Sequence, residues 1–460
     1  MRIELAGRRA PTAGAANEIG RTTADTLAAN GPNGAVDGRK KAGVGGGEIR
    51  ATVPRRPLAC APGDAAGEVD IPFRYRGRMS RRIAWRVGAA VVSIIATLPL
   101  AFAAQNSDGN PDMQARVEQI IAPAMSALVP KNGPGGVAVA VRIAGCTLYF
   151  NQGFADQGTQ RPITSDSLFN LASLRKPFEA TLVAQGVLRG ELSLDDPVNK
   201  YVGELQGAYI RRVTIGELAT HTSGLLLPTD HPPWPDTSYT LGEFLAMLNA
   251  WTADHGEAPG KQRIYTHAGY VLLQLALERR YGRPIGALIE KRILKPLGMN
   301  STLVPERGPD NRAIMSAQFM RRAVQGYAAD GKAIGAPGNQ QSYYDFPGTG
   351  QMFSTARDLA LFVAAALNEG ASDVELRKAL QFTQRQAFRV DERNAQAMAW
   401  EINTLGGAPI VDKPGGLNNA SAYMGLVPER RLGIVILSNR GDVYPHEAAR
   451  NVILPALAKL

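Results

Sequence analysis

The stretch SAYMGLVPERRLGIVIL, residues 421–437, decides the fold. Two apolar runs, Ser421–Val427 and Leu432–Leu437, flank the polar tetrapeptide Pro428-Glu429-Arg430-Arg431. Apolar runs of this length on either side of a short polar turn are typical of paired strands. Because the second run has no polar residue at all, it is typical of a strand inside the protein. We therefore predict a hairpin of buried strands near the C-terminus.

Further strands are expected at the other end of the chain, at Val137–Val141 and Thr147–Phe150. Met113–Leu128 and Pro445–Leu457 have helical spacing and would bracket the strands, although Pro455 disfavours the last turn of the second helix. Between the two sets of strands, helices are expected at Leu241–Ala250, Ala268–Arg280, Pro284–Ile293 and Thr355–Asn368. This order predicts a three-layer α+β fold, in which an antiparallel sheet built from both chain ends is flanked by helices and a mostly helical region is inserted.

The positive charge of the chain is concentrated in its first quarter. The whole chain of 460 residues carries a formal charge of +10, with 45% hydrophobic and 20% charged residues. Most of the excess of basic over acidic residues lies in residues 1–103, and the remainder is nearly neutral. A nucleic-acid partner is therefore not expected, because such partners need a basic surface on the folded part.

The segment from Met79 has the pattern of a secretory signal. Arg81, Arg82 and Arg86 precede an apolar run, Val87–Leu98, and Ala101-Phe102-Ala103 suits cleavage. We expect a signal peptide at 79–103, a protein exported to the periplasm or secreted, and no membrane span after cleavage. The alternative is an uncleaved anchor from Val87 to Ala104. Residues 1–78 have no sustained hydrophobic period and are expected to be disordered or not translated, leaving a domain at 104–460.

Cysteine and histidine usage favours neither a disulfide framework nor a metal site. Cys60 and Cys146 are the two cysteines of the chain, and the first lies before the predicted domain. The five histidines are scattered, without the spacing of zinc ligands. No cofactor or metal is expected.

Ser173-Leu174-Arg175-Lys176 places a nucleophile and an amine at the start of a predicted helix that ends at Gly190. Residues three apart share one helix face, so the hydroxyl of Ser173 and the amine of Lys176 can meet. Pro177 is tolerated only in the first turn and therefore pins the helix start near Ser173. The alternative is that Ser173 only caps the helix and that Lys176 only contacts solvent.

Tyr265-Thr266-His267 precedes a second apolar helix. Two nearby ammonium groups would lower the pKa of Tyr265, because they stabilise the phenolate. The phenol would then be a candidate proton acceptor from Ser173. A buried tyrosine whose hydroxyl is simply hydrogen-bonded is the alternative.

Lys413-Pro414-Gly415-Gly416 opens the last part of the sheet. Pro414 cannot donate a ladder hydrogen bond, which predicts an edge strand. The Gly416 amide, together with that of Ser173, could form an oxyanion hole. An ordinary loop-to-strand transition with a surface lysine is the alternative.

These motifs together resemble the serine β-lactamase and penicillin-binding protein family, above all its class C β-lactamases. The resemblance covers residues 104–460 and is also carried by LDDPV (194–198), LATHTSG (218–224), LGM (297–299), FSTARDL (353–359) and GIVILSN (433–439). It implies that Ser173 is acylated, that Lys176 and Tyr265 share proton transfer, and that Lys413 supplies positive potential. It also implies an oxyanion hole formed by Ser173 and Gly416, with substrate contacts at His267, Gly415 and Gly416.

Four positions depart from the class C pattern. His267 and His446 stand where asparagine is usual, and Pro414 and Leu417 stand where threonine is usual. Since these polar positions recognise the β-lactam in that class, we expect the four departures to change substrate recognition more than acyl transfer. A neutral His267 can accept a hydrogen bond from Lys176, whereas an imidazolium would repel it. We therefore expect activity to fall as the pH drops through the pKa of His267.

The resemblance leaves several functions open. Hydrolysis of β-lactams by a monomeric enzyme is the leading interpretation, and a D-alanyl-D-alanine carboxypeptidase or a short-chain esterase could use the same residues on a peptide or an ester. A penicillin-binding sensor that stays acylated is the non-enzyme alternative. The chain has no Gly-x-Ser-x-Gly motif of α/β-hydrolases, no H-E-x-x-H metal motif and no phosphate-binding loop.

Overall fold

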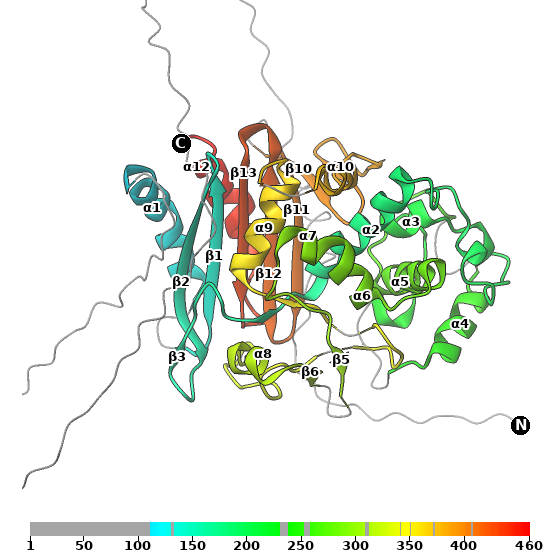
Figure 1. Cartoon of the computed structure of the whole chain (residues 1–460), viewed down its shortest axis with the longest axis horizontal. Helices are drawn as coiled ribbons and strands as arrows, with labels where there is room; N and C mark the ends of the chain where they lie inside the picture. The colour runs from blue at the N-terminus through cyan, green and yellow to red at the C-terminus, as the bar shows by residue number, and fades with distance from the viewer. Residues whose placement is uncertain are drawn as a thin grey trace, which may run out of the picture. The chain divides into compact units, whose positions relative to one another are not determined.

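One antiparallel sheet organises the protein (Figure 1). The computed structural model describes residues 111–129, 133–230, 238–252, 258–308, 312–340, 342–349, 351–370, 373–405 and 408–460. The sheet has nine strands in the order β3-β2-β1-β13-β12-β11-β10-β9-β8. Of the strands from the N-terminal part, β1 (Gly136–Ile143) pairs on one side with β2 (Cys146–Asp156) and on the other with the C-terminal strand β13 (Leu432–Ser438). The predicted three-layer α+β fold, with a sheet built from both chain ends, is confirmed.

The predicted hairpin forms the centre of this sheet. Strand β12 (Ala420–Val427) pairs with β13 from Val427 opposite Leu432 to Ser421 opposite Ser438. The connection is a 3₁₀ turn at Pro428–Arg430 followed by Arg431 in the left-handed region, at a φ of 48°. Every residue of both strands is buried, because helices cover both faces of the sheet.

The prediction of an edge strand at Pro414 is only half right. Strand β11 (Ala408–Leu417) lies between β12 and β10 (Glu401–Leu405), but β10 pairs only with Ala408–Asp412. From Lys413 to Leu417 the strand pairs with β12 alone. Pro414 is therefore in an edge segment of an internal strand, as its missing N–H requires. The far edge of the sheet carries β9 (Asn394–Gln396) and β8 (Phe388–Arg389), and the near edge carries β3 (Arg161–Pro162).

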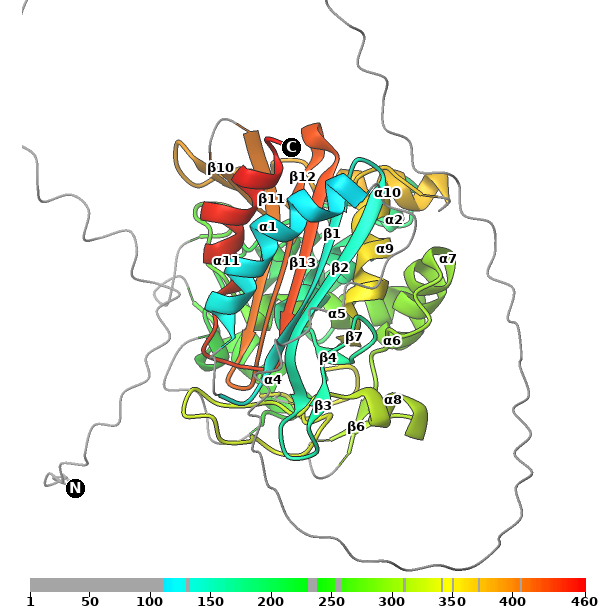
Figure 2. The same ribbon diagram turned by 90° about the vertical axis from the view of Figure 1, so that its left-hand side faces the viewer.

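Terminal helices cover one face of the sheet (Figure 2). They are α1 (Pro111–Leu128), α11 (Pro445–Ala448) and α12 (Leu454–Leu457), and a π-helical turn at Ala449–Ile453 joins the last two. The expected helix at Pro445–Leu457 is thus continuous, and it contains Pro455 as the second residue of α12, directly after the π-helical turn. Residues such as Val117, Ile121 and Ile434 form the core between these helices and the sheet.

The other face carries α9 (Ala356–Ala366) and the mostly helical region. The helices of this region are α3 (Ile215–Ala219), α4 (Leu241–Ala250), α5 (His267–Tyr281), α6 (Ile285–Ile289), α7 (Lys295–Leu297), α8 (Ala317–Arg322) and α10 (Val374–Thr383). Two short strand pairs, β4 (Phe169–Asn170) with β7 (Phe353–Ser354) and β5 (Glu306–Arg307) with β6 (Ala313–Ile314), complete it. The four predicted helices are found within a few residues of their expected bounds as α4, α5, α9, and α6 with the π-helical turn at Glu290–Leu294 that continues it. The other helices of this region were not predicted.

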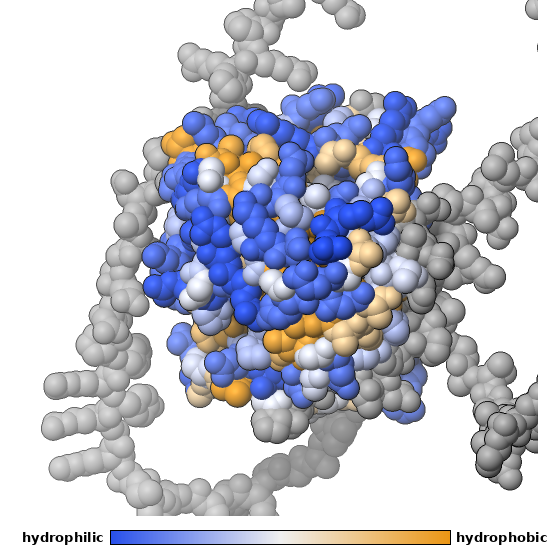
Figure 3. Space-filling model, turned by 90° about the vertical axis from the view of Figure 1, so that its right-hand side faces the viewer, coloured by the Kyte–Doolittle hydropathy of each residue, from blue (hydrophilic) through white to orange (hydrophobic). Residues whose placement is uncertain are grey.

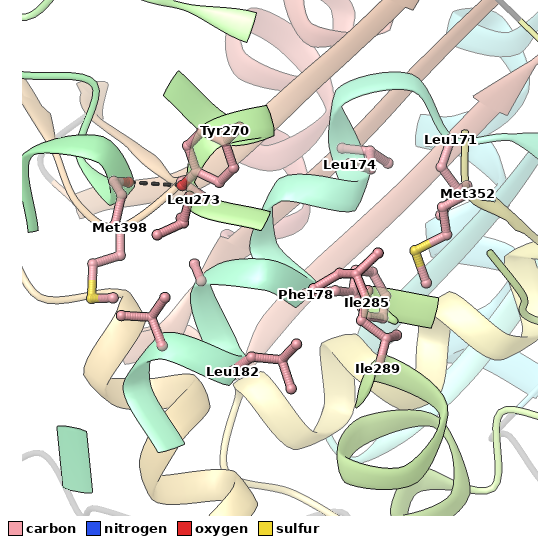
Figure 4. Close-up of a cluster of buried hydrophobic side chains, with 14 of the residues drawn as sticks. Leu171, Leu174, Phe178, Leu182, Tyr270, Leu273, Ile285, Ile289, Met352 and Met398 are labelled. Atoms are coloured by element: carbon pink, nitrogen blue, oxygen red, sulfur yellow. Dashed lines mark hydrogen bonds between the residues drawn. The ribbon is translucent and has the colours of Figure 1, made fainter. Parts of the chain in front are cut away.

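Helix α2 (Lys176–Leu188) lies inside the molecule between these parts. It is buried around its whole circumference from Lys176 to Gly186, as its lack of a polar face requires. Phe178 packs against Phe362 of α9 with ring centroids 4.3 Å apart. On its other sides α2 packs against α5, α6 and α10 in one continuous core (Figure 4). A helix held this way presents its N-terminus at a rigid position.

The predicted signal peptide at 79–103 and the extension at 1–78 lie outside the described residues. Within the ranges that are described, no helix has both the length and the apolar character that a membrane crossing requires. The face that carries α3 and α4 is mostly hydrophilic, with separate apolar patches (Figure 3).

We predict that truncation at the centre of the sheet is costly. Ile434 is fully buried, so Ile434→Ala should lower the free energy of unfolding by about 2–5 kcal/mol through lost burial and an unfilled cavity. Ile314 is 60% exposed, so Ile314→Ala should change it by less than about 0.5 kcal/mol. Urea denaturation followed by circular dichroism measures both, and equal losses would contradict the core assignment.

Candidate active site

Ser173 lies at the mouth of the buried helix. A 3₁₀ turn at Ala172–Arg175 runs directly into α2, so the predicted helix start is confirmed. Ala172, just before the serine, has a φ of 48°, and its N–H donates to the Asn170 side chain at 3.1 Å. A non-glycine residue in this conformation costs about 1–3 kcal/mol and persists only where its surroundings hold it. This bend sets the half-buried Ser173 at the start of the turn, in the field of the helix N-terminus.

Lys176 follows one helical turn later on the same face. Its Nζ donates a hydrogen bond to Ser173 Oγ at 3.2 Å, which confirms the contact predicted from the spacing. The lysine is 9% exposed. Its ammonium group is therefore a strong local charge beside the hydroxyl.

Tyr265 reaches the same hydroxyl from the segment before α5. Its Oη lies 2.6 Å from Ser173 Oγ, although the two residues are 92 positions apart in the chain. Burial alone would raise the pKa of Tyr265, but the ammonium groups of Lys176 and Lys413 outweigh burial and lower it to about 8. Hydrogen bonds from Lys176 and Ser173 act in the same direction. The phenol is thus within reach of the serine proton and is ionised more readily than an ordinary tyrosine.

Lys413 completes the positive environment from the sheet. Its Nζ lies 4.6 Å from the centre of the Tyr265 ring, and its side chain is 2% exposed. Burial lowers the pKa of Lys413, while Tyr265 and Glu401 oppose that effect. Glu401 lies 3.8 Å from Lys413 and 3.1 Å from Arg263, and it accepts a hydrogen bond from Arg450 at 2.8 Å.

The first of the two glycines after Pro414 lies against the backbone of Ser173. A Cβ at Gly415 would lie 3.0 Å from the Leu171 carbonyl oxygen and 3.2 Å from the Ser173 nitrogen. The absence of a side chain at Gly415 thus lets β11 approach the backbone of the nucleophile. A Cβ at Gly416 would meet no atom within 4 Å, and this residue is exposed. Gly416 follows the glycine that contacts Ser173 and borders open space, which is compatible with the predicted oxyanion hole.

His267 is the first residue of α5, and its tautomer is set by its neighbour. Its Nδ1 lies 2.9 Å from the Thr229 carbonyl oxygen, which can only accept, so the proton is on Nδ1 and Nε2 is an acceptor. Burial, then Lys176, lowers the pKa of His267 to about 4. The ring is therefore neutral at physiological pH.

Asp230 anchors the start of α5 below His267. Its carboxylate accepts hydrogen bonds from the backbone N–H groups of His267 and Ala268 and from the Thr266 hydroxyl. Burial raises the pKa of Asp230 to about 6 against these hydrogen bonds. An anion at this place satisfies free helix N–H groups and the helix dipole.

The structure thus brings Ser173, Lys176, Tyr265 and Lys413 together, with His267, Gly415 and Gly416 around them. His446 does not belong to this group. It lies on α11 near Arg450 and Glu401, where burial lowers its pKa. Pro414 and Leu417 are half-buried on the edge segment of β11.

Sequence reasoning missed four residues around the site: His221, Arg263, Glu401 and Asp230. His221 occurs in the motif LATHTSG, but the motif alone assigns it no role. The other three act through contacts across long sequence separations and leave no local signal. Among the described residues, no cluster of three or more His, Cys, Asp or Glu side chains could hold a metal ion.

The chain is similar to known beta-lactamases. The sequence model of the Beta-lactamase family matches residues 117–457. A beta-lactamase from Pseudomonas fluorescens is 28% identical over 375 residues, which cover 74% of this chain and 99% of the relative. A beta-lactamase from Escherichia coli K12 is 27% identical over 368 residues, which cover 72% and 91%.

Solved structures of two kinds share the fold. One is a class C beta-lactamase with 26% sequence identity and a TM-score of 0.63, covering 75% of this chain and 96% of that one. Another is a D-alanine carboxypeptidase from Burkholderia cenocepacia with 27% identity and a TM-score of 0.63, covering 76% and 99%.

The lowered pKa of Tyr265 predicts a pH dependence. If the phenolate accepts the serine proton, acylation of Ser173 should speed up as the pH rises from 6 to 8 and level off above about 8. Tyr265→Phe should lower the rate by about 10²–10⁴-fold and remove this rise. Release of nitrophenol from p-nitrophenyl acetate, followed between pH 5 and 10, measures both; a pH profile unchanged in the variant would contradict the role of Tyr265.

The pKa of His267 predicts a separate loss of activity in acid. Below about pH 4 the ring gains a proton and repels Lys176, so the rate should fall more steeply there than in His267→Asn. Asp230 titrates nearer pH 6 and is present in both proteins, so it does not contribute to the difference. Superimposable acid limbs of the two proteins would rule out this effect of His267.

Proposed function

Because this chain belongs to the beta-lactamase family and is a serine hydrolase, we propose that it hydrolyses the β-lactam amide bond through an acyl-enzyme on Ser173. The observation that carries the proposal is the contact of Ser173 Oγ with Tyr265 Oη at 2.6 Å between two buried ammonium groups. An isolated serine hydroxyl is a poor nucleophile, and this arrangement supplies both a proton acceptor and a stabilising charge.

In the acylation step, Ser173 Oγ forms a bond to the carbonyl carbon while its proton passes to Tyr265. The carbonyl π electrons move onto oxygen, where the amides of Ser173 and Gly416 stabilise the developing anion. When the carbonyl re-forms, the carbon–nitrogen bond of the lactam breaks. The leaving nitrogen then takes this proton from Tyr265, and Lys176 and Lys413 stabilise the phenolate that exists before the first transfer and is restored by the second.

Deacylation repeats the same steps with water in place of Ser173. Water adds to the ester carbonyl and gives up a proton, and the carbon–oxygen bond to Ser173 breaks as Oγ regains a proton. Tyr265 and Lys176 contact Ser173 Oγ and are positioned to carry these protons as well. A protein that cannot admit this water would stay acylated and act as a penicillin sensor.

A second candidate is a D-alanyl-D-alanine carboxypeptidase or a short-chain esterase. Pro414 and Leu417 give the edge of β11 no hydroxyl with which to bind a substrate carboxylate. His267 offers an acceptor where a class C enzyme would have an amide. A relative with the same fold and similar identity is a D-alanine carboxypeptidase, so the fold supports this chemistry too.

We also propose export of the protein as a monomer. The pattern at 79–103 favours a signal peptide and a mature chain from about Ala104, acting in the periplasm or outside the cell. The substrate would be a small acyl compound, either a β-lactam, a cell-wall peptide or an ester.

Replacing the nucleophile gives the decisive measurement. Ser173→Ala should abolish turnover of both a chromogenic cephalosporin and p-nitrophenyl acetate, by at least about 10³-fold, because no acyl-enzyme can form. Intact-mass analysis of the parent protein should show an adduct that the variant lacks. Parent-level turnover by the variant would refute the proposed mechanism.

The same assay separates the candidates. Turnover of the cephalosporin supports a β-lactamase, and turnover of the ester alone supports an esterase. Release of D-alanine from a peptide ending in D-Ala-D-Ala supports a carboxypeptidase. A persistent adduct without turnover supports a sensor.

A further inference from the structure

A buried histidine outside the Ser-Lys-Tyr group holds both neighbours of Tyr265. His221 follows α3 and is completely buried. Its carbonyl oxygen accepts a hydrogen bond from the Ile264 N–H at 2.8 Å. Its Nδ1 accepts another from the Thr266 N–H at 3.3 Å. The backbone on both sides of Tyr265 is therefore attached to one residue.

The imidazole ring also contacts the phenol. The ring centroids of His221 and Tyr265 are 4.5 Å apart, with an interplanar angle of 35°. His221 makes a similar contact with Tyr270, at 4.9 Å and 38°. The Tyr270 hydroxyl donates to the Ala219 carbonyl oxygen at 2.7 Å, which ties this ring to α3. The position of the His221 ring is thus fixed by two packed rings and one hydrogen bond.

The segment that carries His221 is itself rigid. Thr222 N–H donates to the Glu217 carbonyl oxygen at 2.9 Å, and the Thr222 carbonyl accepts from Gly260 N–H at 2.7 Å. Thr220, Thr222 and Ser223 are buried as well. The backbone of His221 has a φ of 55°, a conformation that costs energy in every residue except glycine but that histidine and asparagine adopt more often than most. A strained residue retained in a rigid segment points to a positional requirement.

We propose that His221 is a positioning residue that fixes the Tyr265 phenol in line with the Ser173 hydroxyl. The proposal rests on the proposed role of Tyr265 as proton acceptor. It assigns no chemical step to His221: the imidazole sets where the Tyr265 oxygen lies, and Tyr265 moves the proton. Because Nδ1 accepts from Thr266, the ring acts in its neutral form, with its proton on Nε2.

The charges around His221 are consistent with a ring that stays neutral. Burial lowers the pKa of His221 well below its ordinary value, and the positive charges of Lys413, Arg263 and Lys176 lower it further. An imidazolium would lose the acceptor for Thr266. It would also add a further cation beside Lys413, Arg263 and Lys176.

Two variants separate the effect of losing the hydrogen bond from Thr266 to His221 from an effect on folding. His221→Gly suits the positive φ and keeps the backbone bond to Ile264, but it removes both the acceptor for Thr266 and the ring. His221→Asn also suits this φ and keeps an acceptor in its amide oxygen. With p-nitrophenyl acetate, His221→Gly should slow single-turnover acylation at least about 30-fold with little change in the Michaelis constant. His221→Asn should stay within about threefold of the parent.

A double-mutant cycle tests whether His221 acts through Tyr265. In a Tyr265→Phe background there is no hydroxyl to position, so adding His221→Gly should cost less than about threefold. Adduct growth by intact mass measures these slow rates. An equal loss in both backgrounds would overturn the proposal, because it would mean a merely structural role. An undiminished rate in His221→Gly alone would also overturn it.

Thermal melts and circular dichroism of each variant accompany the rates. Should His221→Gly fail to fold, His221→Asn decides the question alone, and a loss above about tenfold in that folded variant would overturn the proposal. Failure of the proposed function looks different, since Ser173→Ala would then still form an adduct or Tyr265→Phe would react at the parent rate.

Discussion

The site depends on two buried ammonium groups that share one phenol. Burying a cation is costly unless an opposite charge or a polar partner lies nearby. Lys176 and Lys413 lie 5.2 Å and 4.6 Å from the centre of the Tyr265 ring, and Glu401 supports Lys413 from the other side. A phenolate at Tyr265 would compensate both lysines. A negative charge on Tyr265 would thus stabilise the two buried lysines, and the same two lysines lower the pKa of Tyr265.

This requirement explains why three separate elements converge. Lys176 comes from the inner helix α2, Lys413 from strand β11, and Tyr265 from the segment before α5. Each element is rigid for its own reason: α2 is enclosed by the core, β11 is paired to β12, and α5 starts on the Asp230 carboxylate. A charge network continues from Lys413 through Glu401 to Arg450, which also binds Asp412 with two hydrogen bonds. The terminal helices are thereby connected to the strand that carries Lys413.

We expect the surroundings of this centre to affect the choice of substrate rather than acyl transfer. His267 donates a hydrogen bond from Nδ1 to the Thr229 carbonyl oxygen, which leaves Nε2 as an acceptor. An imidazole in this state differs chemically from the amide side chain of asparagine. Pro414 and Leu417 place apolar side chains on the part of β11 that follows Lys413. Relatives with this fold include both beta-lactamases and a D-alanine carboxypeptidase, which agrees with the general finding that one fold hosts several substrates.

The sequence by itself determined what depends on short-range pattern. The hairpin at 421–437 follows from uninterrupted apolar runs around a polar turn, and the Ser173–Lys176 contact follows from helix geometry. The family resemblance of the motifs already placed Tyr265 and Lys413 with Ser173, whereas tertiary structure alone decided the other distant contacts of the site. The attachment of Tyr265 to His221 and the edge confined to the second half of β11 have no local signature. The pKa values of Tyr265 and His267 likewise depend on burial and on charges from other elements, which exist only once the chain has folded.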